Sequence, residues 1–283
     1  AGLSLLGDHI LYGIASGDAV YRMDENGNVA YTLEVGGDVR SASAIGIDTS
    51  VYITSSDRNL YAFSKYGTPM WPALPLGGII SCTPTIDYLS KQQSSSKIYV
   101  GIENKNFIAV KRSDGSVDWS YFADSPIRNS AVITLDKKLI FATVKGTIYG
   151  FNLSALNMPV SPNWSFSLPD SITSSFAVDK NGYFYIGTKN GHILKIQIEH
   201  NRQPEVLWDI NIGEGINSSP VIGKDGIIYI GSCSGKLYAI HKEDGSIKWN
   251  YQTNNAIYST PAISNSGVIY YANQSGEIYA MDD

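Results

Sequence analysis

The sequence is poor in charged residues, in cysteine and in long apolar runs. Only 17% of its 283 residues are charged, and the formal net charge is −5. Because nucleic acid requires a basic face, we expect no nucleic-acid partner. No run of about 18 apolar residues occurs, so we expect no membrane-spanning segment. Two cysteines, Cys82 and Cys233, are too few for a disulfide framework or a structural zinc site, and we expect free thiols.

The signatures of common catalytic sites are also missing. The four histidines are scattered without metal-ligand spacing, and neither a G-x-S-x-G motif nor a P-loop occurs. The chain begins at Ala1 without a signal-like segment. We therefore expect a processed product or an excised part of a longer protein, and the compartment cannot be read from the sequence.

Apolar and aromatic residues, by contrast, are abundant. The chain is 43% hydrophobic and contains 19 tyrosines, 5 tryptophans and 27 glycines. A chain of this composition can bury a substantial core, which excludes intrinsic disorder.

An internal repeat runs through the whole chain. Each copy has an aromatic residue in a short β-type run, and these aromatics lie 40 to 47 residues apart, at Tyr12, Tyr52, Tyr99, Phe141, Tyr185, Tyr229 and Tyr270. A second β-type run begins seven or eight residues after each aromatic. A further ring follows in six copies, at Tyr31, Trp71, Trp119, Trp164, Trp208 and Trp249. So regular a register predicts one structural unit repeated seven times.

The best-written copy, 216–252, divides into four short strands, here called A to D. We expect strand A over 216–222, B over 227–232, C over 236–241 and D over 247–252. Turns containing Gly226, Gly235 and Gly245 separate them, because glycine tolerates the positive φ of a tight hairpin. No 3.6-residue apolar period is sustained, so we expect almost no helix. The pattern predicts an all-β, seven-bladed β-propeller with four-stranded antiparallel blades.

The chain reaches only strand C of the seventh copy, so we expect the last blade to lack its outer strand. Residues 1–283 are expected to form a single β-propeller domain and a monomer. The blades are predicted at approximately 1–36, 37–78, 79–125, 126–170, 171–214, 215–255 and 256–283. Two interpretations stay open: the propeller closes with a three-stranded blade, or the chain was cut from a longer propeller.

The repeat also predicts how neighbouring blades pack. Two residues after most strand-B aromatics stands a small residue, for example Gly101, Gly187 or Gly231. We expect these small residues to let adjacent sheets approach closely. Tyr31 and the five tryptophans are interpreted as packing between blades, where a Trp can bury roughly 150–250 Å². The alternative is that these rings stack on a ligand.

The stretch that ends in tryptophan resembles the repeat of pyrroloquinoline quinone (PQQ) enzymes, A-x-D-x-x-T-G-x-x-x-W. The closest copies are AVKRSDGSVDW at 109–119 and AIHKEDGSIKW at 239–249. Asp stands in place of the usual Thr in both, and Lys111 or His241 replaces the usual Asp. The resemblance covers the whole chain and implies a PQQ-like β-propeller. This repeat occurs in quinoprotein dehydrogenases and in non-catalytic propellers, among them outer-membrane assembly lipoproteins of the BamB type.

The features of the enzymatic branch are missing. Quinoprotein alcohol dehydrogenases carry an adjacent Cys-Cys pair and a Ca²⁺ held by carboxylate and amide oxygens. Cys82 and Cys233 fall in different blades, and no such ligand cluster can be assigned. We therefore expect a non-catalytic scaffold that binds a protein or a ligand and has no cofactor. The alternative is a PQQ-dependent oxidoreductase, or a fragment of one, with PQQ and Ca²⁺. The resemblance alone implies an extracytoplasmic location.

A candidate ligand site lies at the start of strand A. The residue after the first aliphatic residue of this strand is polar in six copies: Arg40, Ser81, Arg128, Thr173, Asn217 and Tyr258. Because strand A lines the central channel of a propeller, we expect these side chains at one opening. Arg40 and Arg128 suit a small anion or a carboxylate of a partner, with Asn217 and Tyr258 as further candidates. The alternative is that the arginines pair with carboxylates such as Asp38 and Asp124.

Three insertions lengthen the repeat, at about 88–97, 154–163 and 198–206. They belong to the A–B loop of the third copy and the C–D loops of the next two, which emerge on the same face. Recognition sites are usually built on loops of a rigid scaffold, so this face is a candidate surface for a protein partner. Drift in tolerant loops is the alternative.

Overall fold

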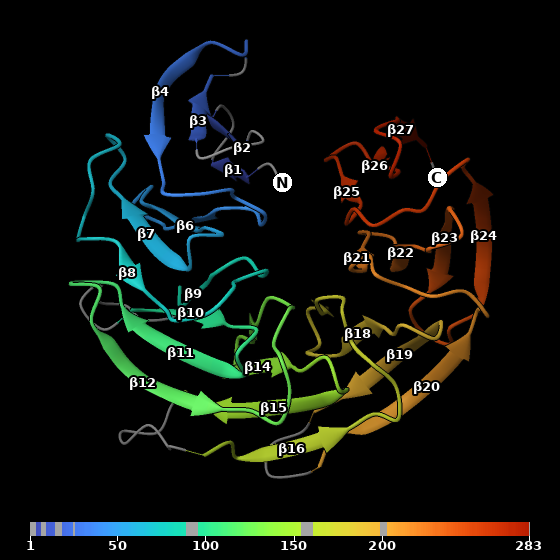
Figure 1. The fold of residues 1–283 in the computed structure, drawn as a ribbon. Coiled ribbons are helices and arrows are strands. Elements are labelled where there is room, and N and C mark those ends of the chain that lie inside the picture. The colour runs from blue at the N-terminus through green and yellow to red at the C-terminus, as the bar shows by residue number, and fades with distance from the viewer. Residues whose placement is uncertain are drawn as a thin grey trace. The chain divides into compact units, whose positions relative to one another are not determined.

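The computed structural model describes residues 4–6, 10–14, 19–24, 26–88, 96–153, 161–198 and 203–282. These residues form 27 β-strands and no helix. The strands assemble into antiparallel sheets in which neighbours in the sequence are neighbours in the sheet (Figure 1). Six sheets have four strands and the last has three. The predicted all-β fold of seven blades, with the last lacking its outer strand, is confirmed.

The strands of the first three sheets are β1 (Ser4–Leu6), β2 (Ile10–Ile14), β3 (Ala19–Met23), β4 (Val29–Glu34), β5 (Ala44–Ile45), β6 (Val51–Thr54), β7 (Asn59–Phe63), β8 (Leu74–Pro75), β9 (Thr85–Ile86), β10 (Lys97–Gly101), β11 (Asn106–Lys111) and β12 (Val117–Phe122). Those of the next two are β13 (Val132–Ile133), β14 (Lys138–Ala142), β15 (Thr147–Asn152), β16 (Trp164–Ser167), β17 (Ala177–Val178), β18 (Phe184–Gly187), β19 (His192–Gln197) and β20 (Glu205–Asn211). Those of the last two are β21 (Val221–Ile222), β22 (Ile227–Gly231), β23 (Lys236–His241), β24 (Ile247–Gln252), β25 (Ala262–Ile263), β26 (Ile269–Ala272) and β27 (Ile278–Met281).

The chain divides into two compact units. The first contains residues 1–143 and 151–162, and the second contains 144–150 and 163–283. The boundary between the units passes through the fourth sheet. That residues 1–283 form a single domain stays a prediction. In the described part of the chain, no helix has the length and apolar character that a membrane span requires.

Strand A is much shorter than the sequence pattern predicts. In the copy at 216–252, strands B, C and D agree with the prediction to within one residue, but β21 contains only Val221–Ile222. The prediction of a seven-residue strand A is wrong because a side chain replaces the backbone pairing. Ser218 Oγ accepts a hydrogen bond from the Gly231 amide of strand B at 3.0 Å, in place of a backbone carbonyl.

The same side-chain contact recurs two residues after the first aliphatic residue of the other strand-A segments. Ser174 Oγ donates to the Gly187 carbonyl at 2.8 Å, and Ser259 Oγ donates to the Ala272 carbonyl at 2.8 Å. The first unit has the corresponding contacts of Ser41 with Thr54, Cys82 with the Gly101 carbonyl, and Asn129 with the Ala142 amide. Most of these polar side chains are buried, and they satisfy strand-B groups that a buried sheet cannot leave unpaired.

Small residues on strand B let neighbouring sheets approach closely, as the sequence predicts. A Cβ placed on Gly231 would lie 2.3 Å from Cγ2 of Ile257, in the segment that leads into the seventh sheet. A Cβ on Gly101 would lie 2.2 Å from Cγ2 of Ile127. These distances are too short for any side chain, so the aliphatic residue of the next sheet occupies the place of the missing Cβ. The apolar core therefore lies between successive sheets.

The aromatic residue in or just before strand D packs on the C–D turn of the following sheet. A Cβ on Gly115 would lie 2.6 Å from Cδ2 of Trp71, and one on Gly245 would lie 3.1 Å from Cδ2 of Trp208. Trp208 Nε1 also donates to the Lys242 carbonyl at 3.1 Å. Both glycines have positive φ, +73° and +76°, which glycine adopts without strain. These contacts join the second sheet to the third and the fifth to the sixth.

The other rings at this repeat position are also packed against protein groups. Their contacts are Tyr31 OH with the Lys65 carbonyl, Trp119 with the Phe151 ring, Trp164 with Gly150, and Trp249 with the Tyr229 ring.

Replacing Ser218 tests the side-chain contact that shortens strand A. We expect Ser218→Ala to lower the free energy of unfolding by about 1–3 kcal/mol, because the buried Gly231 amide loses its acceptor. Ser218→Cys introduces the residue type that holds the equivalent position in the third sheet, Cys82. It retains a weak acceptor and should lower the free energy of unfolding less than Ser218→Ala does. Urea unfolding followed by tryptophan fluorescence measures both variants. An equal loss of unfolding free energy in Ser218→Ala and Ser218→Cys would contradict a role for the acceptor atom of residue 218.

Candidate functional site

The predicted ligand residues Arg40 and Arg128 both lie in the first unit, in the segments that lead into β5 of the second sheet and β13 of the fourth sheet. Glu103, in the turn after β10 of the third sheet, accepts hydrogen bonds from Ser81 Oγ at 2.5 Å and from Arg128 Nη2 at 3.1 Å. Arg40 Nη2 lies 3.9 Å from Asp38 Oδ2. Each arginine therefore has a carboxylate close to it.

Glu103 offsets the positive charge of this group. Partial burial favours a higher pKa for Glu103, but the hydrogen bond from Ser81 and the charges of Arg128 and Arg40 hold the pKa below its usual value. The carboxylate is thus ionised near neutral pH. The arginines thus lie beside carboxylates, as in the alternative interpretation. The partner of Arg128 is Glu103, whereas Asp124, the carboxylate named in that interpretation, accepts a hydrogen bond from a threonine. Anion binding by Arg40 and Arg128 stays a prediction.

The equivalent positions in the second unit are polar and accessible. Asn217 Oδ1 accepts a hydrogen bond from Thr173 Oγ1 at 2.8 Å, which joins the equivalent polar positions of the fifth and sixth sheets. Tyr258 is 46% exposed. Asn217 and Tyr258 therefore both stand at the surface of the second unit.

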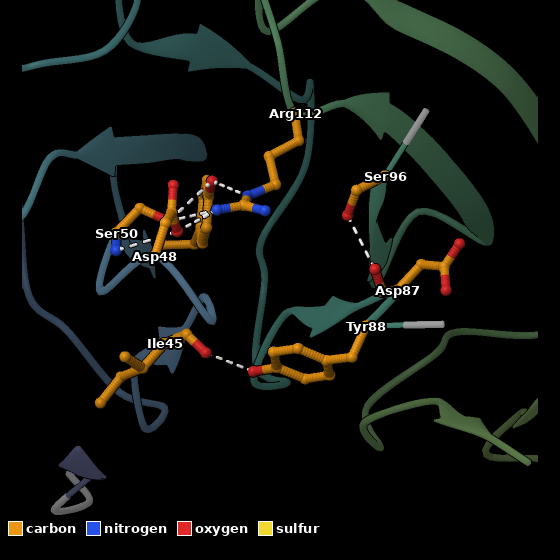
Figure 2. A network of polar contacts seen from close by, with 8 residues as sticks. Ile45, Asp48, Ser50, Asp87, Tyr88, Ser96 and Arg112 are labelled. Carbon is orange, nitrogen blue, oxygen red and sulfur yellow. Dashed lines mark hydrogen bonds and ion pairs between the residues drawn. The ribbon is translucent and has the colours of Figure 1, made fainter. Parts of the chain in front are cut away.

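A second polar cluster, which the sequence pattern did not indicate, surrounds Arg112. This residue directly follows β11 and is only 3% exposed. Its Nε donates to Tyr52 OH at 2.6 Å, and its Nη2 donates to Ser50 Oγ at 2.9 Å and pairs with Asp48. Figure 2 shows the guanidinium directed at the A–B hairpin of the second sheet. A buried guanidinium requires such acceptors, since an unpaired buried charge is strongly destabilising.

Further hydrogen bonds lie beside Arg112 (Figure 2). Tyr88 OH donates to the Ile45 carbonyl, and Ser96 Oγ donates to the Asp87 carbonyl at 2.7 Å. The Arg112 amide donates to the Ser96 carbonyl at 3.2 Å. The cluster thus fastens the third sheet to the second at the end that carries their A–B hairpins.

The second unit contains a similar contact. Lys242, directly after β23, lies 3.6 Å from Asp179 in the A–B turn of the fifth sheet. Tyr185 OH of that sheet donates to the same carboxylate at 3.2 Å. We call this arrangement the inter-sheet tie. A cationic residue directly after strand C of one sheet contacts an acidic residue in the A–B turn of the preceding sheet, next to the strand-B tyrosine of that preceding sheet. The sequence signal was a basic residue at equivalent places, 112 and 242, in the two copies closest to the PQQ repeat.

Apolar side chains stand at the A–B turns of the first unit. We call Ile47, Tyr88 and Leu135 the apolar turn row, because each is the second residue after strand A of its sheet. Ile47 and Leu135 are each 83% exposed, and Tyr88 is 55% exposed. The hydrogen bond from Tyr88 to the Ile45 carbonyl brings the A–B segments of the second and third sheets together.

The predicted insertions fall largely on residues 89–95, 154–160 and 199–202, which lie outside the described residues. The first of these segments directly follows Tyr88 of the apolar turn row.

Two features that the sequence analysis associates with quinoprotein dehydrogenases, the cysteine pair and the Ca²⁺ ligands, can be compared with the described residues. Both cysteines are free, with Cys82 buried in the first unit and Cys233 partly exposed in the second. Burial raises the pKa of the Cys82 thiol to about 11, so this thiol is protonated at neutral pH. Ca²⁺ needs about six to eight oxygen ligands. No three His, Cys, Asp or Glu side chains of the described residues lie together in a way that could hold a metal ion.

Repeat, sheet order and packing together define a β-propeller. Residues 200–283 match the family model described as "Outer membrane protein assembly factor BamB". The structure is similar to the crystal structure of BamB from Moraxella catarrhalis, with a TM-score of 0.72 and 14% sequence identity, over 100% of this chain and 87% of that chain. Among curated proteins, none matches the sequence. The fold is therefore that of a BamB-type propeller.

Neutralising Glu103 tests the anion interpretation of the two arginines. We expect sulfate to raise the melting temperature of Glu103→Gln more than that of the wild type at pH 7, because Arg40 and Arg128 then lack the carboxylate that offsets them. Charge reversal of both arginines in this variant should remove the added protection. Differential scanning fluorimetry measures it, with chloride at equal ionic strength as the control. Equal protection of the wild type and Glu103→Gln by sulfate would contradict anion binding by Arg40 and Arg128.

Asp48 gives a pH-dependent test of the tie in the first unit. Partial burial opposes ionisation of Asp48, but hydrogen bonds from Ser50 and the charge of Arg112 keep its pKa below the usual value. Its stabilisation is therefore present above the unfolded-state pKa and is lost as the pH falls through the folded-state pKa. We expect Asp48→Asn to lower the free energy of unfolding by about 2 kcal/mol at pH 7, and the difference to shrink below about pH 4.

Urea unfolding between pH 7 and pH 2 measures this difference. Asp136→Asn is the control, because it removes an ion pair of an exposed carboxylate with Lys138 and should change the stability little. A loss in Asp48→Asn that does not vary with pH would contradict the ionic role of Asp48.

Proposed function

We propose that the protein is a non-catalytic binding scaffold that recognises a protein partner outside the cytoplasm. The repeat, the fold and the match of residues 200–283 to the BamB family model support this proposal. That family is described as an outer-membrane protein assembly factor, and we propose a related assembly role for this chain. The fold is shared with many proteins, since 1608 solved chains match it, so the contact surface has to be identified from this chain's own residues.

The apolar turn row carries the proposal. Tight turns favour polar residues and glycine, yet Ile47 and Leu135 stand almost fully exposed at such turns. A single exposed apolar side chain is ordinary, whereas several at the same place in consecutive sheets mark an interaction surface. Tyr88 adds an aromatic ring with a polar tip, a residue type that is enriched at protein interfaces.

The second unit provides an internal comparison. The same register position after strand A is Lys180, Lys224 and Asn265 in the fifth, sixth and seventh sheets. All three residues are polar and exposed, so the turn itself does not require an apolar residue. The apolar residues of the first unit are therefore explained better by recognition than by folding.

Paired turn variants test the surface. The partner is captured by cross-linking to the wild-type protein, purified, and titrated against each variant by calorimetry. We expect Ile47→Ser combined with Leu135→Ser to weaken binding at least about tenfold, the effect of losing about 1.4 kcal/mol of apolar contact. Lys180→Ser, at the same register position in the fifth sheet, is the control and should bind like the wild type. Unchanged affinity of the first pair would show that the partner binds elsewhere.

The oxidoreductase alternative makes the opposite prediction for added PQQ and Ca²⁺. A quinone-dependent enzyme would give the absorbance of bound quinone and would reduce an electron-accepting dye in the presence of an alcohol. We expect neither signal from the purified protein, and observing both would overturn the proposal of a non-catalytic scaffold.

A further inference from the structure

The inter-sheet tie is half-formed between the sixth and seventh sheets, which both belong to the second unit. Asp225 precedes Tyr229 by four residues, as Asp48 precedes Tyr52. Asp225 Oδ1 accepts the Ile227 amide at 3.1 Å, and its Oδ2 accepts a hydrogen bond from Tyr229 OH at 3.4 Å. The acid and the tyrosine of the tie are therefore both in place.

The cation of the tie is missing from the sequence at this interface. Arg112 stands three residues after Ala109, the strand-C residue that pairs with the strand-B aromatic, and Lys242 has the same place in the sixth sheet. In the seventh sheet the corresponding strand-C residue is Ala280, which puts the equivalent of Arg112 at position 283. That position is Asp in the sequence and lies outside the described residues.

A cavity of about 520 Å³ opens at this interface. In the third sheet the ring of Tyr88 crosses to the second sheet, where its hydroxyl reaches the Ile45 carbonyl. The equivalent residue of the seventh sheet is the shorter Asn265, which leaves the corresponding space open. The lining of the cavity includes Asp225, Tyr229, Ile263, Asn265 and Asp282.

The charges around the cavity favour a cation. Two carboxylates, Asp225 and Asp282, line it against one ammonium group, that of Lys224. Lys224 Nζ lies 3.5 Å from the Asn265 carbonyl. Among the ion pairs of the described residues, none involves Asp225. The Asp225 carboxylate thus has neutral donors as its hydrogen-bond partners, whereas Asp48 and Asp179 each have a cation.

We propose that this cavity binds the guanidinium group of an arginine side chain from a partner polypeptide. The guanidinium would take the place that Arg112 holds at the interface of the second and third sheets. Arg112 bonds an acid and a tyrosine hydroxyl at once through different nitrogens, which the planar fork of a guanidinium allows better than a single ammonium. The proposal rests on the proposed scaffold function and names the chemistry of one of its contacts. A cavity of this size has room for the side chain and adjoining peptide groups.

The experiment uses N-acetyl-arginine amide as the probe and N-acetyl-citrulline amide, its neutral isostere, as the matched ligand. Both are titrated into the isotopically labelled protein, and backbone amide shifts are followed by NMR. We expect the arginine probe to shift amides of 223–229 and 263–267 with a dissociation constant in the range of about 1–10 mM, and the citrulline probe to bind at least about tenfold more weakly. Added salt should weaken the arginine response, because charge contributes to binding.

Two variants assign the response to the cavity. Asp225→Asn retains an acceptor for the Ile227 amide but removes the charge, and it should weaken arginine binding at least about tenfold. Asn265→Tyr introduces the residue found at Tyr88 and should block the cavity. Asp179→Asn is the control, because Lys242 already occupies that tie, and it should leave binding unchanged. A second control is Ile47→Ser combined with Leu135→Ser, which should bind the probe normally, so that this site and the apolar turn row are tested separately.

Three outcomes would overturn the proposal. They are absence of any arginine response up to about 50 mM, equal binding of arginine and citrulline probes, and equal arginine binding by the wild type and Asp225→Asn. Folding of each variant is checked from amide shifts remote from the cavity.

Discussion

The closeness with which one β-sheet can approach the next is the constraint on which the rest of the structure depends. An aliphatic side chain such as Ile257 touches the backbone of the preceding sheet at Gly231, where a Cβ would lie only 2.3 Å away. The amide of the same Gly231 donates to the short polar side chain of Ser218, and the paired part of strand A contains only Val221–Ile222. The close approach of the next sheet and the buried polar side chain thus meet at one strand-B residue.

The part of the fold that follows from local pattern could be predicted from the sequence. The regular spacing of aromatics such as Tyr185 and Tyr229 predicts seven sheets, and turn glycines such as Gly245 separate strands B, C and D to within one residue of their observed bounds. Strand A could not be predicted in the same way. The residues 216–222 alternate like a strand, but Ser218 bonds strand B through its side chain, which is a property of the folded sheet.

The candidate sites could be predicted only in part, since they join residues far apart in the chain. The row containing Arg40 and Arg128 was found because its members share one repeat position. The ion pair of Arg128 with Glu103 was missed, because Glu103 lies in a turn whose acid is not repeated. Arg112 and Asp48 are 64 residues apart, and only the contact of two sheets brings them together. A periodic pattern shows which positions are equivalent, whereas the side chains that differ at those positions determine which contacts form.

The inter-sheet tie places its acid and its tyrosine in one repeat and its cation in the next. Each repeat therefore supplies the acid and the tyrosine of one tie and the cation of another. These two contributions lie at different positions of the repeat and can differ independently from copy to copy. Where the sequence has a cation at this position, as at Lys242, an ion pair within the chain joins the two sheets. Where the sequence has another residue at that place, as at position 283, the acid and the tyrosine stand without the internal cation and form the site that we propose for an arginine of a partner. In a repeat protein of this kind, a difference at one side chain is enough to turn an internal contact into a binding site, without any change in the backbone.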